Sequence, residues 1–231
     1  MVTFESFEKK IGVTFRDKSL LRTAFTHRSY INENKGSGME HNERLEFLGD
    51  AVLELVSTVY LFNKYPRKNE GDLTSYRSAL VNAATLSEIA TELDMDSYLL
   101  LSKGESKDKG RARQIILANT IEALIGAIYL DQGYEGAEIF INKYITPLID
   151  DIAKTGKWMD SKSSFQEKAQ DKVGFTPSYK VVRETGPDHD KFFTIAVFLG
   201  DEKIAEGEGK SKQEAEQNAA KNALTVKKWI Y

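Results

Sequence analysis

The sequence contains no cysteine, so this chain can form neither disulfide bonds nor thiolate metal sites. It has no uninterrupted apolar run of about 18 residues, and we therefore expect no membrane-spanning helix. The first residues, MVTFESFEKK, lack the apolar centre of a signal peptide, so we expect a cytoplasmic protein. No internal repeat is apparent.

The chain also lacks an excess of basic residues. Its net charge is −3. Residues 1–150 carry 18 basic and 22 acidic side chains, and residues 161–231 carry 12 and 11. Neither part has the strongly basic composition typical of a nucleic-acid-binding domain. Any contact with nucleic acid must therefore come from local patches.

The chain does contain two segments with different periodicity. Residues 1–151 show helical spacing and no strand-like alternation, which predicts one all-α domain. We expect Asp72 to cap its fourth helix. Residues 152–162 have weak periodicity and a glycine, and we interpret them as a linker. The expected helices of the first domain span 3–10, 17–24, 42–63, 72–81, 83–92, 111–130 and 134–151.

The remaining residues, 163–231, predict a small α+β domain of α-β-β-β-α order. Ser211 and Glu214 fit a capping box at the start of its second helix, and Lys210 and Lys212 flank that start. Free backbone N–H groups and two lysines predict an anion site, whereas an ordinary capped helix is the alternative. The expected elements are helices 163–173 and 211–224 and strands 178–184, 191–199 and 203–208.

Three acidic residues share one face of the expected helix over 42–63. Glu46 and Asp50 lie within about 60° of Glu43 if each residue turns about 100°. Like charges at this spacing repel, and a bound cation is the simplest compensation. A solvated acidic face is the alternative. The opposite face is apolar and predicted to be buried; it contains Leu45, Leu48, Val52, Leu55, Val56 and Val59.

The expected helix over 111–130 carries matching oxygen ligands. It is apolar nearly all round, which predicts a buried core helix. Asn119 and Glu122 share one face, and Gly126 continues that face and would let another helix approach closely. A buried, unpaired glutamate costs several kcal/mol. A metal shared with the first acidic helix would compensate Glu122. The alternative is an ion pair with Arg44 or Arg113.

With these residues placed, the chain resembles bacterial ribonuclease III over nearly its full length. HNERLEFLGD (41–50) and ILANTIEALIGAIYLD (116–131) are similar to the two acidic helices of that family. THRSY (26–30) and EGDLTSYRSALV (70–81) also match its pattern. GEGKSKQEAEQNAAKNAL (207–224) resembles the end of a double-stranded RNA-binding domain. The five motifs occur in the family's order.

The resemblance implies a homodimeric endonuclease that cleaves double-stranded RNA with Mg²⁺, or with Mn²⁺ as a substitute. Products with 5′ phosphates and short 3′ overhangs, and roles in rRNA and mRNA processing, would follow. No membrane or small-molecule cofactor is expected. The family's pattern places catalysis on Glu43, Asp50 and Glu122, metal ligation on Glu46, Asp50, Asn119 and Glu122, and Glu70 near the active site.

Phe47 and Asn119 are the two unusual positions of the endonuclease part. Phe47 projects beside the carboxylates and off the apolar stripe, which indicates a second buried surface, and the resemblance places it at the dimer interface. Asn119 stands where the family usually has aspartate. An amide oxygen still binds a hard cation but supplies no charge. If Asn119 disables the metal site, the chain is a non-catalytic double-stranded RNA-binding protein. A purely protein-binding helical domain would leave the small domain unexplained.

In the small domain, the resemblance places Gln166, Glu167 and His189 in successive minor grooves of duplex RNA. It places Lys210 and Lys212 on the phosphates between those grooves. Gln213 stands where the family often has another lysine, so one phosphate contact is missing. Taken alone, His189 is an incidental residue of a turn, and a structural role is also the simpler reading of His27.

Overall fold

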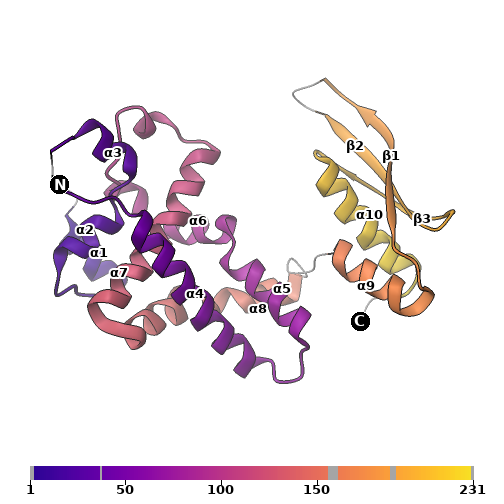
Figure 1. Ribbon diagram of the computed structural model, residues 1–231, viewed down its shortest axis with the longest axis horizontal. Helices are drawn as coiled ribbons and strands as arrows, with labels where there is room; N and C mark the ends of the chain where they lie inside the picture. Colours follow the sequence, from indigo (N-terminus) through magenta and orange to yellow (C-terminus); the bar gives the residue numbers. More distant parts are fainter. Residues whose placement is uncertain (1–2, 37, 156–160, 188–190, 230–231) are drawn as a thin grey trace. The chain divides into compact units, whose positions relative to one another are not determined.

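The computed structural model describes residues 3–36, 38–155, 161–187 and 191–229. The chain divides into two compact units, Met1–Trp158 and Met159–Tyr231. Figure 1 shows a helical first unit and a smaller second unit that contains a sheet and two helices. Each unit has its own core of buried apolar side chains. The predicted all-α part followed by a small α+β part is therefore confirmed.

The first unit is built from α-helices joined by short turns. Its core is lined by apolar side chains that recur at helical spacing, which explains why the periodicity of the sequence predicts most of these helices. The helices are α1 (Phe4–Ile11), α2 (Lys18–Ala24), α3 (Arg28–Glu33), α4 (Glu43–Lys64), α5 (Glu70–Val81), α6 (Ala83–Glu92), α7 (Arg111–Tyr144) and α8 (Ile149–Thr155), with 3₁₀ turns at Met95–Tyr98, Glu105–Lys107 and Thr146–Leu148.

Helix α7 is the centre of this unit, because α2, α4 and α6 all pack against it. Its backbone leaves helical geometry at Gly133, where φ is 76° and ψ is −169°. This break explains the predicted boundary between residues 130 and 134. By length and composition, Arg111–Lys154 is apolar enough to cross a membrane, but 61% of its most apolar window is buried inside the protein. A buried core helix can have the same length and the same apolar composition as a membrane-spanning helix.

One whole helix and the start of another differ from the sequence prediction. Helix α3 was not expected, because it has only six residues, too few for a visible period. The side chain of His27 caps it by accepting from the backbone N–H of Ser29. Helix α5 begins at Glu70, and Asn69 is its cap, so the prediction of Asp72 as the cap is wrong. The N–H of Asp72 donates to Asn69 Oδ1 at 2.7 Å.

The second unit is an antiparallel sheet in the order β1-β2-β3, with two helices. Val197 and Leu199 of β2 are buried in one core with Phe165 of α9 and Ala219 of α10, so helices cover one face of the sheet. Small residues on α10 allow this close packing. The elements are α9 (Ser161–Val173), β1 (Ser178–Thr185), β2 (Phe192–Leu199), β3 (Glu202–Gly209) and α10 (Lys212–Val226).

Helix occupies both ends of the predicted linker, residues 152–162. Helix α8 continues to Thr155, and α9 already begins at Ser161. The reason is burial, because Ile149 at the start of α8 is fully buried in the first core and Ser161 is 5% exposed. A short helix with one buried turn leaves too little periodicity for its end to be seen in the sequence.

Candidate active site

Helices α4 and α7 cross at two glycines, and this crossing builds the site. A Cβ atom on Gly49 of α4 would overlap the carbonyl oxygen of Glu122, and one on Gly126 of α7 would overlap the carbonyl oxygen of Leu45. Only glycine permits two backbones to approach so closely. The predicted role of Gly126 is confirmed, whereas its counterpart Gly49 was not identified from the sequence. The sequence signal for a close helix contact is the position of Gly49 between Glu46 and Asp50, two acids one helical turn apart.

The crossing brings Glu122 of α7 to the acidic face of α4. Burial raises the pKa of Glu122 to about 7, and the carboxylates of Asp50 and Glu46 add to this shift. Electrostatic interaction of this kind requires the three side chains to lie near one another. The structure therefore gathers the three carboxylates that the sequence predicted would share a cation.

Asn119 joins the same group. Burial raises the pKa of Glu46, the charges of Glu43 and Asp50 raise it further, and a hydrogen bond from the Asn119 side chain opposes the rise. A side-chain amide that donates to a carboxylate stabilises its charged form. Asn119 thus lies against Glu46, one helical turn from Glu122. Its amide supports Glu46 without adding a fourth negative charge.

Neither arginine considered as a partner of Glu122 pairs with it. Arg113 is 6% exposed, and its guanidinium binds Asp96 at 3.3 Å and the backbone carbonyls of Glu105 and Asp108. Arg44 is exposed and lines a pocket beside α2. Within the residues that the structure describes, Glu46, Asp50 and Glu122 form no ion pair with Lys, Arg or His. Their charges remain uncompensated by the protein.

The donor set of this site fits a hard divalent cation. Three carboxylates and an amide offer oxygen ligands only, which Mg²⁺ and Mn²⁺ prefer over nitrogen or sulfur. In the described part of the chain, no three acidic or histidine side chains lie close enough to form a ready-made metal cage. Mg²⁺ does not require one, because it keeps several waters and takes one or two carboxylates directly.

The two outlying acids behave differently from the central group. Glu43 is 45% exposed, and its carboxylate lies 3.3 Å from Arg28 Nη1 and 3.8 Å from His41 Nδ1. Its charge still reaches Glu46. Glu70 is exposed at the start of α5, and its carboxylate accepts from the Thr74 hydroxyl at 3.1 Å. No described interaction links Glu70 to the central group, so its predicted place near the site stays a prediction.

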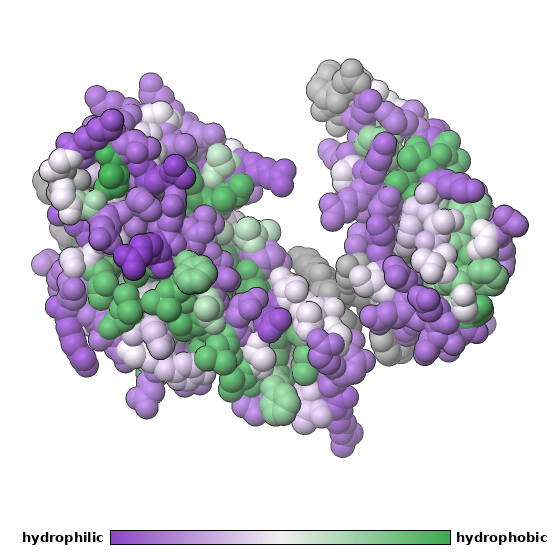
Figure 2. Space-filling view, viewed as in Figure 1, coloured by the Kyte–Doolittle hydropathy of each residue, from purple (hydrophilic) through white to green (hydrophobic). Residues whose placement is uncertain are grey.

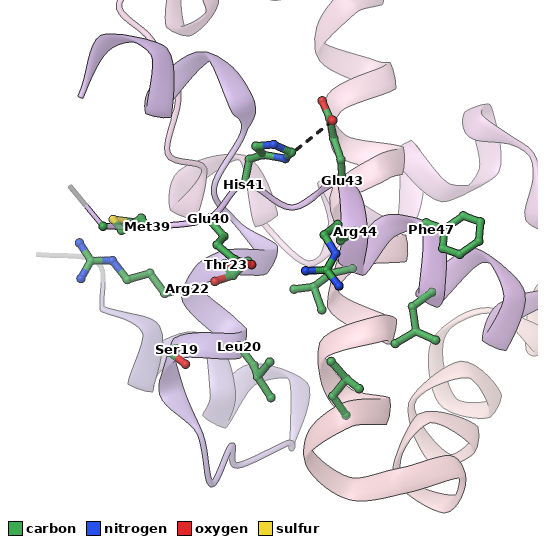
Figure 3. Close-up of a pocket in the computed structure, with 14 residues that line it drawn as sticks. Ser19, Leu20, Arg22, Thr23, Met39, Glu40, His41, Glu43, Arg44 and Phe47 are labelled. Carbon is green, nitrogen blue, oxygen red and sulfur yellow. Dashed lines mark ion pairs between the residues drawn. The ribbon is translucent and has the colours of Figure 1, made fainter. Parts of the chain in front are cut away.

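Phe47 lies beside the acids and is exposed, as its projection from the apolar stripe predicted. Its side chain is 80% exposed. It borders an open pocket of about 930 Å³ between α2 and α4, which Leu20, Leu48 and Leu130 also line (Figure 3). Charged side chains, among them Arg22 and Arg44, line the rest of this pocket. Exposed apolar side chains that gather on one face are typical of an interaction surface.

The apolar stripe of α4 is only partly buried. Leu45, Val52 and Val56 lie in the core, but Leu55 is 54% exposed and Val59 is 39% exposed. The prediction that Leu55 and Val59 are buried within the chain is therefore wrong. The stripe is wider than the surface that α7 covers. Figure 2 shows apolar side chains along this face of the helical unit. The exposed apolar side chains of α4 are Leu55 and Val59 of the stripe, together with Phe47 and Phe62.

In the second unit, the predicted contact residues are exposed. Gln166 and Glu167 lie on α9, and Lys210 and Lys212 flank the start of α10. Their side chains are therefore available to a ligand. His189 lies outside the described residues.

The start of α10 is capped as the sequence predicted. Ser211 Oγ accepts from the N–H of Glu214 at 3.1 Å. The Glu214 carboxylate also accepts from the N–H of Lys210 at 2.8 Å. These two backbone donors are thus already used, whereas the N–H groups of Lys212 and Gln213 in the first turn take no part in these two bonds. The predicted anion site therefore stays a prediction.

Comparison with family models gives two matches. Residues 17–149 match the family described as Ribonuclease-III-like, and residues 161–227 match the double-stranded RNA binding motif. The first match contains the crossing of α4 and α7. The second begins where α9 begins.

Similar proteins extend over almost the whole chain. Ribonuclease 3 of Carboxydothermus hydrogenoformans is 47% identical over 96% of this chain and 95% of that protein. Ribonuclease 3 of Pelotomaculum thermopropionicum is 45% identical over 94% and 90%. The crystal structure of the nuclease domain of ribonuclease III from Campylobacter jejuni is 41% identical, with a TM-score of 0.56; it covers 65% of this chain and 96% of that domain.

Proposed function

The chain belongs to the ribonuclease III family, and from this membership we propose that it is an Mg²⁺-dependent endonuclease that hydrolyses the phosphodiester bonds of double-stranded RNA. The observation that carries the proposal is the α4–α7 crossing. There, Glu46, Asp50 and Glu122 interact electrostatically, and none of them forms an ion pair with a basic side chain in the described part of the chain. Such a group is costly in a folded protein unless a cation binds to it.

The proposed metal ligands are Glu46, Asp50, Asn119 and Glu122. These residues would hold Mg²⁺, or Mn²⁺ in its place, which would supply an activated water and charge stabilisation at the phosphate. The contribution of the protein is to hold the carboxylate oxygens together. Burial is the main cause of the raised pKa of Glu122, with Asp50 and Glu46 adding to it, and a cation bound beside it would favour the ionised carboxylate.

Glu43, Asp50 and Glu122 are the proposed catalytic residues. Glu122 is partly buried, whereas Glu43 and Asp50 are exposed at the ligand-accessible side of the site. Glu70 is proposed to lie near the active site when RNA is bound. No histidine or cysteine nucleophile is required for hydrolysis by activated water.

The second unit is proposed to bind the duplex. The major groove of A-form RNA is too narrow to be read, so such domains contact phosphates, 2′-hydroxyls and the minor groove. Gln166 and Glu167 on α9 are proposed for one minor groove and His189 for the next. Lys210 and Lys212 would contact the phosphates between them. Exposed side chains on a rigid helix suit this role.

We further propose a homodimer joined through the exposed face of α4. A two-fold axis places the same surface of each chain against itself. The exposed Phe47 and the leucines of the pocket beside it, Leu20, Leu48 and Leu130, are complementary in kind, which a self-association of this type requires. Two related sites would cut both strands and leave 5′ phosphates with short 3′ overhangs. The substrates would be rRNA and mRNA precursors in the cytoplasm, with no membrane or organic cofactor involved.

The decisive experiment is incubation of a long RNA duplex with the full-length chain in Mg²⁺ or in EDTA. We expect cleavage to short duplexes with Mg²⁺, none with EDTA, and none of single-stranded RNA of the same sequence. Binding of the duplex without cleavage at every Mg²⁺ and Mn²⁺ concentration would instead show a non-catalytic double-stranded RNA-binding protein.

A further inference from the structure

Arg28 is an exposed arginine whose guanidinium reaches the edge of the active site. It is the first residue of α3, and its Nη1 donates to Glu43 Oε1 at 3.3 Å. Its side chain is 65% exposed, and that of Glu43 is 45% exposed. An ion pair this exposed contributes only about 0–1 kcal/mol. Arg28 can therefore leave Glu43 for another anionic group at little cost in free energy.

The backbone that carries Arg28 is held firmly, although its side chain is exposed. His27 caps α3, and Ser29 Oγ accepts from the N–H of Ser102 at 3.1 Å. At the other end of α3, the Glu33 carboxylate accepts from the N–H of Lys103 at 3.0 Å. These bonds tie a six-residue helix to the segment that precedes α7. The backbone of Arg28 is thus held in a fixed position near Glu43.

A positively charged side chain at this edge of the site would favour binding of the negatively charged substrate. Each strand of duplex RNA brings a row of phosphates towards Glu43, Glu46, Asp50 and Glu122, and these like charges repel. A guanidinium has five N–H donors in a planar fork that suits phosphate oxygens. One donor of Arg28 faces Glu43. With most of the side chain in solvent, the other donors are available to an incoming phosphate.

We propose that Arg28 is a phosphate-contacting residue of the endonuclease unit, held by Glu43 while RNA is absent and bound to the RNA backbone at the edge of the active site when the duplex arrives. This inference rests on the proposed function, because it takes double-stranded RNA as the ligand. It adds to the site a contact that positions the duplex for cleavage. It also separates substrate positioning in the first unit from the affinity supplied by the second.

The test compares full-length wild type with Arg28→Gln, Arg28→Lys and the control Lys9→Gln. Lys9 is exposed in the last turn of α1, so the control removes one positive charge from the same unit. Cleavage of a short duplex is measured in Mg²⁺ at several KCl concentrations, and equilibrium binding of the same duplex is measured alongside. Each lost phosphate contact reduces the slope of log affinity against log salt by roughly one unit.

We expect Arg28→Gln to raise KM roughly three- to ten-fold, to leave kcat within about two-fold, and to reduce the salt slope by about one contact. Arg28→Lys should keep most of the slope, and Lys9→Gln should match the wild type. A lower kcat with an unchanged salt slope would show that Arg28 only holds Glu43, and this would overturn the inference. So would an Arg28→Gln variant with wild-type KM and slope.

The two proposals fail in different ways. If the wild type does not cut duplex RNA at all, the proposed function fails, and the binding measurement alone then decides about Arg28. An unchanged salt slope of binding in Arg28→Gln would reject the phosphate contact in that case too. A slope reduced by about one contact would retain it.

Discussion

The α4–α7 crossing of the first unit and the surface of the second unit treat charge in opposite ways. At the α4–α7 crossing, the described carboxylates face one another without a basic partner, and burial raises the pKa of Glu122 to about 7. In the second unit, charged side chains pair across its elements, as Lys162 does with Glu216 at 2.6 Å and Arg183 with Glu208 at 3.3 Å. The first arrangement is unfavourable unless a cation binds, whereas the second is stable by itself.

This difference separates two tasks. A hydrolytic site must concentrate charge that the protein does not neutralise, because the metal has to be bound more strongly than any internal partner. A surface that binds and releases a duplex works best with solvated charges, whose exchange between water and phosphate costs little. The comparison predicts that substitutions at the crossing affect cleavage and metal response, and that substitutions in the second unit affect affinity.

The largest effect is expected for Glu122→Gln. The change keeps the size of the side chain but removes a charged ligand, so cleavage should fall by at least about a thousand-fold. Duplex binding should stay within about two-fold, because the residues proposed to contact RNA are Arg28 and side chains of the second unit, and Glu122 is not among them. Single-turnover cleavage and a gel shift on the same RNA measure both. If the gel shift weakened as much as cleavage, the two tasks would not be separated between the units.

Removal of residues 156–231 should lower the salt concentration at which the enzyme stops cleaving RNA. Both units have their own core, so the remaining helices should stay folded. We expect cleavage of duplex RNA to persist at low salt and to be lost at a lower KCl concentration than in the full-length chain, because affinity is already low without the phosphate contacts of the second unit. Cleavage rates between about 20 and 200 mM KCl test this. A folded truncation that is inactive at every salt concentration would show that the crossing is not sufficient.

A smaller effect is expected for Phe47→Ala. If the exposed ring is an anchor between two copies, its loss should weaken the dimer by about 2 kcal/mol, or roughly thirty-fold in the dissociation constant. Phe47→Asp should weaken it further. The exposed Ile139→Ala is the matched control, because it lies on α7 and is 68% exposed. Sedimentation of all three variants gives the answer, and dimers of equal strength would reject the interface.

The smallest effect is expected for Asn119→Asp. A carboxylate binds a hard dication better than an amide, so the Mg²⁺ concentration for half-maximal cleavage should fall by up to about ten-fold, or about 1.4 kcal/mol. The new charge also replaces the hydrogen bond that the amide gives to Glu46, so the metal-free protein should melt earlier. If the wild type is inert and the variant cuts, Asn119 is an inactivating residue. Equal Mg²⁺ requirements would place Asn119 outside the ligand set.

The sequence predicted much of the site because helical spacing decides which side chains share a face. Glu46, Asp50, Asn119, Glu122 and Gly126 lie together as the pattern indicated. The same spacing does not say which part of an apolar face the chain itself covers. Leu55 and Val59 belong to the stripe of α4 but lie beyond the reach of α7, and so they are exposed.

The features that the sequence did not predict depend on distances between segments that are far apart in the chain. Gly49 matters because the carbonyl of Glu122 occupies the space of its missing side chain. Arg28 matters because α3 ends up beside Glu43. The cap of α5 was misplaced for a local reason, since Asn69 and Asp72 are both good caps and lie three residues apart.

The central claim is that the carboxylates at the crossing are an unfilled cation site, and metal-free stability against pH tests it most directly. The pKa of Glu122 rises from 4.5 to about 7 on folding, so the folded state binds the extra proton between these values. The full shift corresponds to about 3 kcal/mol, and screening by solvent around this partly exposed carboxylate reduces it to roughly 2 kcal/mol. Stability in EDTA should therefore fall by about that amount as pH rises from about 4.5 to 7, and then level off. Saturating Mg²⁺ should remove the fall, and Glu122→Gln should not show it. Identical pH profiles for wild type and Glu122→Gln, with no response to Mg²⁺ in either, would contradict the account.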